Sequence, residues 1–404
     1  MKVRLLTVIA LLTTLKSIGQ IDEDKIKQHI KILSDDSLMG RGTGSEGEQM
    51  AATYIESQFK KINLKPKGDA NDYRQSFLFK GGVHGTGPAG KANNLIGFLD
   101  NNADQTIIIG AHFDHLGLGE NGSSMDANPK GKIHNGADDN ASGVAGLIEL
   151  ARHFANKAKE KYNFLFIAFS GEELGLYGSK YFTEHPTLDL LKVNCMINLD
   201  MIGRLDPVTN ALAVSGTGTS AVWENEIKKL SSDELKIKTD SAGMGPSDHT
   251  SFYLKNIPVL HFFTGSHSDY HKPSDDWQKI NFAGEKTVLE FIVRLVENLD
   301  ALPKLTFLPT KNKSMGSARS FKVTLGIMPS YTSSEEGLKV DGVTDGKPAQ
   351  RAGILTGDLI IKIGAYSIKD IQAYMTALGK FEKGQTVPVK VKRNKDVVSL
   401  RVTF

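Results

Sequence analysis

Acidic and imidazole side chains follow the apolar runs of this sequence, close to the point where each run ends. The run Phe164–Phe169 has six consecutive apolar residues, which is typical of a strand buried on both faces of a sheet. Glu172 and Glu173 come soon after it. Two adjacent carboxylates beside a buried strand repel each other and lose hydration, so we expect a positive group between or beside them. A metal ion is such a group, and it predicts further ligands elsewhere in the chain.

Further candidate ligands lie after other apolar runs or before a helical pattern. In open α/β sheets the site lies outside the carboxyl ends of the strands, so we expect these groups to converge on one crevice. Imidazole and carboxylate ligands together suit zinc, with cobalt or manganese as substitutes. The ligands outnumber those of one tetrahedral ion and favour two ions about 3.5–4 Å apart that share a carboxylate. The candidates are His112, Asp114, Asp138, Asp139, Asp200, His267, Asp269 and His271.

Apolar periodicity predicts the elements that must position these groups. Strands alternate with helices, which indicates an α/β three-layer sandwich around a mostly parallel mixed sheet. In the helix expected at Asn140–Phe154, Val144, Leu147, Ile148 and Ala151 form an apolar stripe, and Asn140 or Ser142 is suited to cap it. The other expected helices are Ile26–Leu33, Glu48–Ile62 and Glu285–Leu299, and the other strands are Asn94–Leu99, Thr106–Ala111, Cys195–Leu199, Leu212–Val214 and Pro258–Phe262.

The segment Gly40–Ser45, GRGTGS, lies between the first two expected helices and is too rich in glycine for regular structure. A phosphate-binding loop is one reading of such glycines. No predicted strand precedes the segment and no Gly-Lys-Ser/Thr ending follows it, so the sequence favours an ordinary loop.

The length of 404 residues predicts more than one domain. Residues 20–302 contain the alternating pattern and all the candidate ligands. Residues 303–320 carry Pro303, Pro309 and a polar run, which predicts a linker. Residues 321–404 contain short β-rich runs, beginning at Phe321–Leu325, around one helix at Ile371–Leu378, which predicts a second, small domain.

The first 19 residues have a basic start, an apolar middle and small residues near Gly19, which predicts a signal peptide and export to the periplasm or the medium. Later segments are too polar for stable membrane insertion. Without Lys2, Arg4 and Lys16 the chain has 46 basic and 46 acidic residues, so its charge does not favour nucleic acid. Cys195 is the sole cysteine, which excludes an intrachain disulfide; its apolar surroundings favour a place in the core.

Six segments carry a resemblance to the secreted dizinc aminopeptidases, whose relatives include glutamate carboxypeptidase and glutaminyl cyclase. The segments are GAHFDHLG (110–117), GADDNASG (136–143), SGEELGLYGS (170–179), NLDMIG (198–203), SDHTSF (247–252) and DYHKPSD (269–275), in the order of the family. The resemblance implies one zinc on His112 and Asp200 and another on Glu173 and His271. It implies that Asp139 bridges both ions and that the Asp139–Asn140 peptide bond is cis.

The same resemblance implies roles for other residues. Glu172 matches the general base, which takes a proton from the metal-activated water and passes it to the leaving amine. Tyr270 stands where some relatives have a tyrosine that hydrogen-bonds the developing oxyanion. Asp114 is expected to orient His112, and Asp275 to orient His271, without binding the metal. Asp248 matches a position beside the metals whose role the sequence leaves open.

Four further polar residues have more ordinary interpretations. We expect Asp138 to be a loop or capping carboxylate, and His115 and His267 to be polar neighbours of the crevice rather than ligands. His249 is expected either to support the site or to be hydrogen-bonded in a turn.

The C-terminal region resembles a PDZ domain of the bacterial protease type, through Leu325-Gly326-Ile327 and the segment GVTDGKPAQRAGILTGDLIIKIG (342–364). The resemblance implies that the backbone N–H groups of Leu325, Gly326 and Ile327 cradle the terminal carboxylate of a peptide, which pairs with a strand edge. The alternative is that this domain only packs on the catalytic domain.

Together these features predict an exported zinc aminopeptidase acting on peptides with a free N-terminus. Three alternatives stay open: glutaminyl cyclisation at a single zinc, carboxypeptidase or dipeptidase activity on the same scaffold, and a PDZ adaptor with an inactive catalytic domain.

Overall fold

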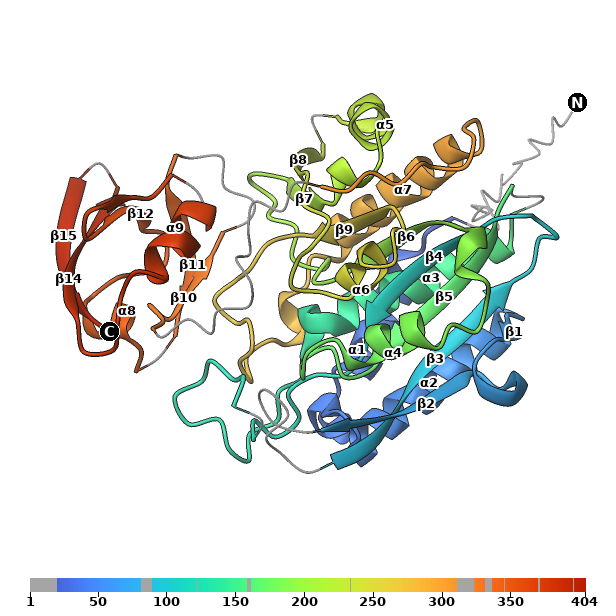
Figure 1. Ribbon diagram of the computed structural model, residues 1–404. Helices are drawn as coiled ribbons and strands as arrows, with labels where there is room; N and C mark the ends of the chain where they lie inside the picture. The colour runs from blue at the N-terminus through green and yellow to red at the C-terminus, as the bar shows by residue number, and fades with distance from the viewer. Residues whose placement is uncertain are drawn as a thin grey trace, which may run out of the picture.

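The computed structural model describes residues 20–80, 89–120, 122–157, 161–232, 234–310, 323–330, 336–344, 346–369, 371–394 and 396–404. The expected signal peptide, residues 1–19, lies outside these ranges, and so does the second part of the expected linker, 311–320. The described residues form two bodies, each with its own sheet and core (Figure 1).

The larger body is an α/β sandwich around a mixed sheet, as the sequence predicts. Its described strands follow the order β1-β3-β5-β4-β6-β9-β7-β8, with β2 also paired to β3. The central strands β5, β4, β6 and β9 run parallel to one another, while β3 and β7 are antiparallel to their central neighbours. The strands are β1 Lys65–Pro66, β2 Arg74–Lys80, β3 Ala89–Leu99, β4 Thr106–His112, β5 Asn163–Phe169, β6 Val193–Leu199, β7 Ala211–Ser215, β8 Lys236–Asp240 and β9 Val259–Phe263.

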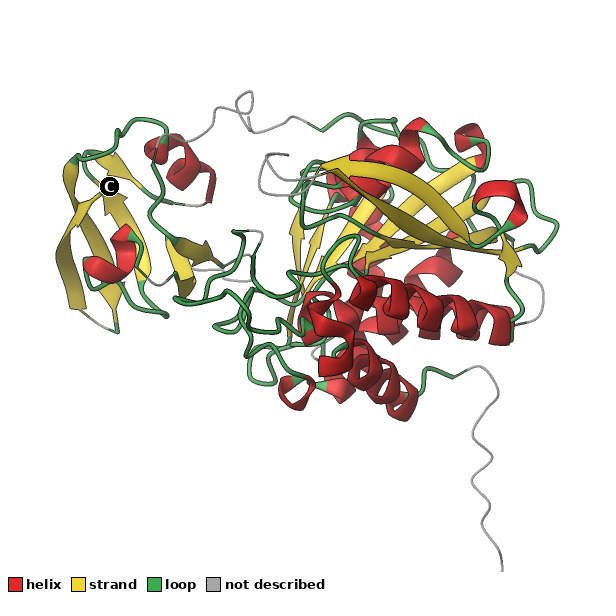
Figure 2. Ribbon diagram, turned by 90° about the horizontal axis from the view of Figure 1, so that it is seen from below, coloured by secondary structure: helices red, strands yellow, loops and turns green. Residues whose placement is uncertain are grey.

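Helices cover both faces of this sheet (Figure 2). One face packs on α1, α2, α3, α5 and α7, and the opposite face packs on α4 and α6. Successive residues of β5 show why the sequence has no alternation there: Phe164 and Phe166 belong to the first core, and Leu165 and Ile167 to the second. The helices are α1 Glu23–Leu33, α2 Glu46–Lys61, α3 Gly143–Ala155, α4 Tyr177–Glu184, α5 Trp223–Leu230, α6 His249–Tyr253 and α7 Phe282–Leu299.

The smaller body contains a second, antiparallel sheet with the order β10-β11-β12-β14-β15 and β13 beside β12. The expected strand at Phe321–Leu325 is wrong for its described part: residues 323–326 form a loop, and β10 begins at Ile327. The elements are β10 Ile327–Pro329, β11 Leu338–Val343, α8 Pro348–Arg351, β12 Leu359–Ile363, β13 Tyr366–Ser367, α9 Ile371–Leu378, β14 Thr386–Arg393 and β15 Asp396–Thr403.

Residues 303–310, expected to begin the linker, instead pack on the larger body. Leu305 is buried in its core, and the backbone N–H of Thr310 donates to the hydroxyl of Tyr253 at 3.0 Å. Cys195 lies in β6 and is fully buried, as expected. Among the described residues, no helix has the length and apolar character needed to cross a membrane.

Candidate metal centre

The last residue of β4, the segments that follow β5, β6 and β9, and the turn before α3 bring the five expected ligands together around the carboxylate of Asp139. Asp139 lies between two imidazoles: its Oδ1 is 3.3 Å from His112 Nε2, and its Oδ2 is 3.2 Å from His271 Nε2. Asp200 completes the first side, with Oδ1 3.5 Å from His112 Nε2. Glu173 completes the second, with Oε2 3.2 Å from His271 Nε2. Asp139 therefore presents one oxygen to each of two ligand groups.

A third imidazole lies on the second side of the centre. His115 is almost fully buried, and its Nδ1 is 2.8 Å from Glu173 Oε1 and 3.9 Å from Asp139 Oδ2. The potential ligand atoms of these three residues lie within 4.8 Å of one another. His115 is therefore a polar neighbour of the expected ligands, as the sequence predicts, and its place beside Glu173 and Asp139 also suits a metal ligand.

The backbone around Asp139 takes an unusual path. Residues Ala137–Ser142 form a wide helical turn, and the Asp139–Asn140 peptide bond is cis, which confirms the expectation. Asn140 Oδ1 accepts from the N–H of Gly143, the first residue of α3, at 3.0 Å, whereas Ser142, at the N-cap position, makes no side-chain capping bond. Asn140 Nδ2 donates to Leu199 O, at the end of β6. This side chain thus ties the turn to the strand that leads into Asp200.

The expected partner of Asp275 is wrong. Asp275 Oδ2 accepts from the backbone N–H groups of Asp138 and Asp139, at 3.0 and 3.1 Å. The ring nitrogen Nδ1 of His271 instead faces the carbonyl oxygen of Ser123 at 2.9 Å. Asp275 therefore supports the turn that carries the shared carboxylate, and a loop carbonyl orients His271.

Asp114 lies beside His112, as the sequence predicts. His112 Nδ1 is 3.2 Å from the carbonyl oxygen of Asp114 and 3.7 Å from its Oδ1. Asp114 Oδ1 also accepts from the N–H of Glu172 at 3.1 Å. One buried carboxylate thus connects the segment of His112 with the segment of the expected general base, whose Oε2 lies 4.0 Å from His112 Nε2.

The electrostatics show that this cluster suits a cation. Burial lowers the pKa of His112, but the carboxylates of Glu172 and Asp200 outweigh it and raise that pKa well above its usual value. Burial likewise lowers the pKa of His271, and Glu173 and Asp139 more than reverse the effect. The carboxylates thus draw positive charge onto both imidazoles. A divalent ion would supply that charge directly, so the donor set fits zinc.

Burial favours the protonated, neutral form of both Glu172 and Tyr270. Burial raises the pKa of Glu172 well above its usual value, against the opposing charge of His112. The ring of Tyr270 stacks on His271, with centroids 3.9 Å apart. Burial raises the pKa of Tyr270 well above its usual value, and the charge of Asp139 adds to this, so the hydroxyl stays protonated and can donate a hydrogen bond.

The remaining candidates surround the centre. Asp138 Oδ1 accepts from the N–H of Gly203 at 2.7 Å, and its Oδ2 lies 3.1 Å from His267 Nε2, which agrees with a loop carboxylate and a polar neighbour. Asp248 is fully buried, and burial raises its pKa to about 7. The ring of His249 stacks on His261, with centroids 4.5 Å apart. Burial lowers the pKa of His249 well below its usual value, so it packs as a neutral ring.

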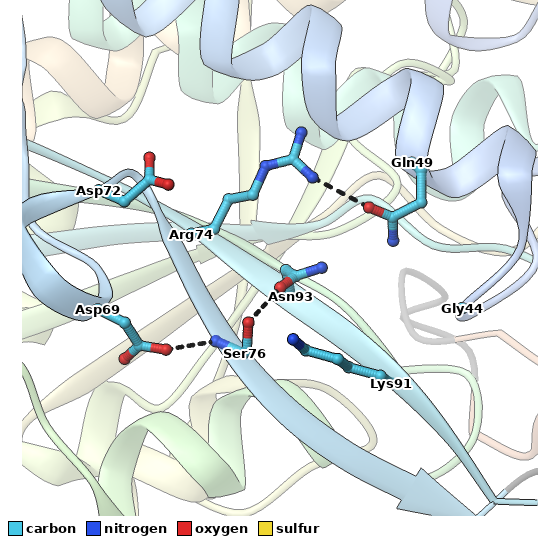
Figure 3. A pocket seen from close by; sticks show the side chains of 8 residues that line it. All are labelled: Gly44, Gln49, Asp69, Asp72, Arg74, Ser76, Lys91 and Asn93. Carbon is cyan, nitrogen blue, oxygen red and sulfur yellow. Dashed lines mark hydrogen bonds between the residues drawn. The ribbon is translucent and has the colours of Figure 1, made fainter.

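A pocket of about 520 Å³ lies elsewhere, over β2, β3 and the start of α2 (Figure 3). Two of its charged groups have local partners: Arg74 donates to Gln49 Oε1 at 3.0 Å, and Asp69 accepts from the N–H of Ser76 at 2.8 Å. None of the expected site residues lines it.

Two family models match this chain. The model described as peptidase family M28 matches residues 94–296, a range that includes all five expected metal ligands. The model described as PDZ domain matches residues 323–404, which correspond to the smaller body.

The chain is also similar to an aminopeptidase and to a glutaminyl-peptide cyclotransferase. Aminopeptidase YwaD of Bacillus subtilis is 31% identical over 158 residues, which are 36% of this chain and 34% of that protein. Glutaminyl-peptide cyclotransferase of Drosophila melanogaster is 21% identical over 302 residues, 67% of this chain and 79% of that protein. This chain thus covers only about a third of the length of the first of these relatives.

A solved structure shares the fold. A Zn-dependent exopeptidase from Parabacteroides distasonis superposes with a TM-score of 0.58 at 18% identity, covering 70% of this chain and 100% of that one. The likeness confirms the three-layer architecture of the larger body.

Proposed function

Because the chain belongs to peptidase family M28, we propose that it is an exported aminopeptidase whose larger body holds two zinc ions and removes N-terminal residues from peptides. One observation carries the proposal: the two carboxylate oxygens of Asp139 face separate ligand groups, each with an imidazole and a second carboxylate. A carboxylate shared between two such ligand groups suits a pair of neighbouring divalent ions.

The ligands divide between the two ions as follows. His112 and Asp200 would hold one zinc, Glu173 and His271 the other, and Asp139 both. When bound, such ions polarise a peptide carbonyl and lower the pKa of water.

The protein's own groups supply the remaining steps. Glu172 takes a proton from the attacking water and delivers it to the leaving amine. The hydroxyl of Tyr270 donates a hydrogen bond to the oxyanion that develops on the carbonyl. Asp114 fixes the ring of His112, and Asp275 fixes the backbone of Asp139.

The domain limits are part of the same proposal. We assign export to residues 1–19, whose basic start and apolar middle match a signal peptide. The catalytic domain takes residues 20–310, because Leu305 and Thr310 pack on the larger body. The linker is then shorter than the sequence alone predicts.

Zinc content and substrate blocking test this function together. The purified chain is expected to bind about two zinc ions per molecule and to release the N-terminal residue from free peptides. It should leave N-acetylated peptides intact, because the free amine is then missing. A chelator should remove the activity, and zinc should restore it. Hydrolysis of the acetylated peptides at the same rate as the free ones would contradict aminopeptidase specificity.

Glutaminyl cyclisation is the second candidate. The match to the Drosophila glutaminyl-peptide cyclotransferase covers 79% of that protein's length. The two activities differ in product and metal content. A peptide beginning with glutamine loses that residue in the first case and ammonia in the second. One zinc per chain together with ammonia release would establish the cyclase.

We further propose that the smaller body binds the C-terminus of a peptide. β10 is the edge strand of its sheet within the described residues, so its outer side is available for pairing. Gly326 has a φ of +73°, and a Cβ added there would lie 2.2 Å from Lys347 Cβ. The backbone of this loop therefore lies against the aliphatic part of the Lys347 side chain and leaves no room for a Cβ at residue 326.

Replacement of Gly326 tests this binding. Gly326→Ala is expected to weaken the binding of peptides with a free C-terminus at least tenfold, since the new methyl group collides with Lys347. Gly353→Ala is the matched control, because Gly353 also has a positive φ, of +82°, but a Cβ there meets nothing within 4 Å. Fluorescence anisotropy with a labelled random C-terminal peptide library measures the effect. Equal binding of C-terminally amidated peptides would contradict a carboxylate site.

A further inference from the structure

The glycine-rich loop at residues 40–45 lies outside the residues matched by the M28 model, which begin at 94. The sequence favours an ordinary loop there. In the structure this loop runs directly behind the metal centre: the N–H of His115 donates to Arg41 O at 3.0 Å, and the N–H of Gly117 donates to Gly40 O at 2.9 Å.

Arg41 is the one charged residue of the loop at residues 40–45, and only 1% of its surface is exposed. Its guanidinium binds backbone carbonyls: Nε donates to Phe113 O at 2.9 Å, and Nη1 to Asn135 O at 2.7 Å. Nη2 donates to Gly136 O at 3.0 Å, and Leu33 O is a further acceptor. Phe113 follows the expected ligand His112, and Gly136 begins the turn that carries Asp139. One side chain thus connects two ligand segments.

Arg41 also stays charged in this position. Burial lowers its pKa to about 10, while Asp139 is the first of several acids that oppose the effect. The guanidinium therefore adds positive charge close behind the carboxylates of the centre. Its fork of N–H donors satisfies several carbonyls at once, which a lysine ammonium does not reproduce.

Thr43 supports the ligand His112 indirectly, through the carboxylate of Asp114. Its hydroxyl donates to Asp114 Oδ2 at 2.7 Å, and Asp114 is the carboxylate beside His112 Nδ1. The first carboxylate oxygen of Asp114 accepts from the N–H of Glu172. Thr43 therefore fixes the rotation of a carboxylate that contacts both a ligand and the segment of the general base.

The end of the loop is tied to a third ligand segment. Glu48 is fully buried; one of its oxygens accepts from the N–H of Gly44 at 2.7 Å, and the other binds the hydroxyl of Ser170, just before Glu172 and Glu173. The glycines permit this close packing. A Cβ on Gly40, whose φ is +70°, would lie 2.5 Å from both Gly117 O and His134 O.

We propose that residues 40–45 belong to the metal centre, with Arg41 and Thr43 as positioning residues for His112 and Asp139. The proposal rests on the function proposed above. It places part of the active-site support before the family-matched region. Neighbouring groups that orient metal ligands typically change metal affinity or activity 10–100-fold when removed, and Thr43→Val should fall in this range.

The decisive variant is Thr43→Val, which keeps the shape of the side chain but cannot donate to Asp114. Zinc affinity, measured by competition with a chromophoric chelator, is expected to fall at least tenfold at one of two sites. The visible spectrum of the cobalt-substituted protein should change as well, whereas the unfolding temperature of the metal-free protein should not. Thr43→Ser should restore the affinity. Thr183→Val is the matched control, because Thr183 is buried on α4 and, within the described residues, its hydroxyl donates only to Lys180 O.

Arg41→Lys gives a second measurement. It is expected to lower the affinity for zinc more than Thr43→Val does, together with the unfolding temperature. If the parent chain binds zinc and Thr43→Val matches its affinity and cobalt spectrum within twofold, the positioning role is wrong. If the parent chain itself binds no zinc, the proposed function fails first.

Discussion

Glu172→Gln is expected to lower kcat about 10³-fold while the zinc content stays at the parent value. The amide has nearly the shape of the carboxylate but cannot accept the proton of the attacking water, and general base catalysis contributes typically about 10²–10⁴-fold. Glu172 is not among the five ligands around Asp139, and its N–H bond to Asp114 belongs to the backbone. The substitution should therefore leave the metal centre assembled.

Two measurements separate this loss from a structural effect. Zinc content by metal analysis and KM for a free peptide should both stay close to the parent values. Glu184→Gln, an exposed position at the end of α4, is the control and should retain full kcat. Turnover by Glu172→Gln at the parent rate would exclude this residue as the base.

Asp139→Asn should abolish activity and reduce bound zinc to less than one ion per chain. The carboxylate presents one oxygen to His112 and the other to His271, whereas an amide presents one oxygen and one NH₂ group. The NH₂ group cannot bind a cation, and the loss of one negative charge weakens the other ligand group too. Replacement of Asp200 or Glu173 removes a ligand from only one side.

Thermal unfolding with and without zinc checks this second result. A ligand that binds only the folded state stabilises it by about 4 kcal/mol at 1,000 times its Kd, so the parent chain should unfold at a markedly higher temperature with zinc present. Asp139→Asn should show almost none of this increase. Asp104→Asn, at an exposed loop position, should behave as the parent does. Retention of two ions by Asp139→Asn would contradict the bridging role.

The core and the order of the candidate ligands could be predicted from the sequence because both depend on local patterns. Phe164–Phe169 has no polar residue, so a strand buried on both faces is the simplest interpretation, and β5 confirms it. The cis bond at Asp139–Asn140 came from the resemblance of GADDNASG to a known family and is also confirmed.

Contacts between side chains and backbone groups far apart in the sequence could not be predicted in the same way. Asp275 accepts from the N–H groups of Asp138 and Asp139, some 137 residues earlier, and a carboxylate looks the same in the sequence whether it faces a ring or a backbone amide. The carbonyl of Ser123 that faces His271 has no side-chain signal at all. Arg41 was missed because its acceptors are carbonyls of three separate segments.

Strand β2 was not predicted, because its sequence pattern is weak. Its inward residues Gln75, Phe77 and Phe79 alternate with outward ones, but a polar residue in the first inward position weakens the pattern. Leu78 points outward with 79% of its surface exposed, which obscures the alternation further. Pairing with the long strand β3, rather than the local sequence, keeps this segment extended.

The seclusion of Cys195 within β6 has a practical consequence. Burial raises the pKa of its thiol and hides its sulfur from reagents, so a maleimide dye has no native target while the fold is intact. A cysteine introduced on the outer side of β10 and another beside the crevice would then be the sole labelled positions. Energy transfer between the two dyes would then measure whether binding of a peptide C-terminus changes the distance between the smaller body and the metal centre.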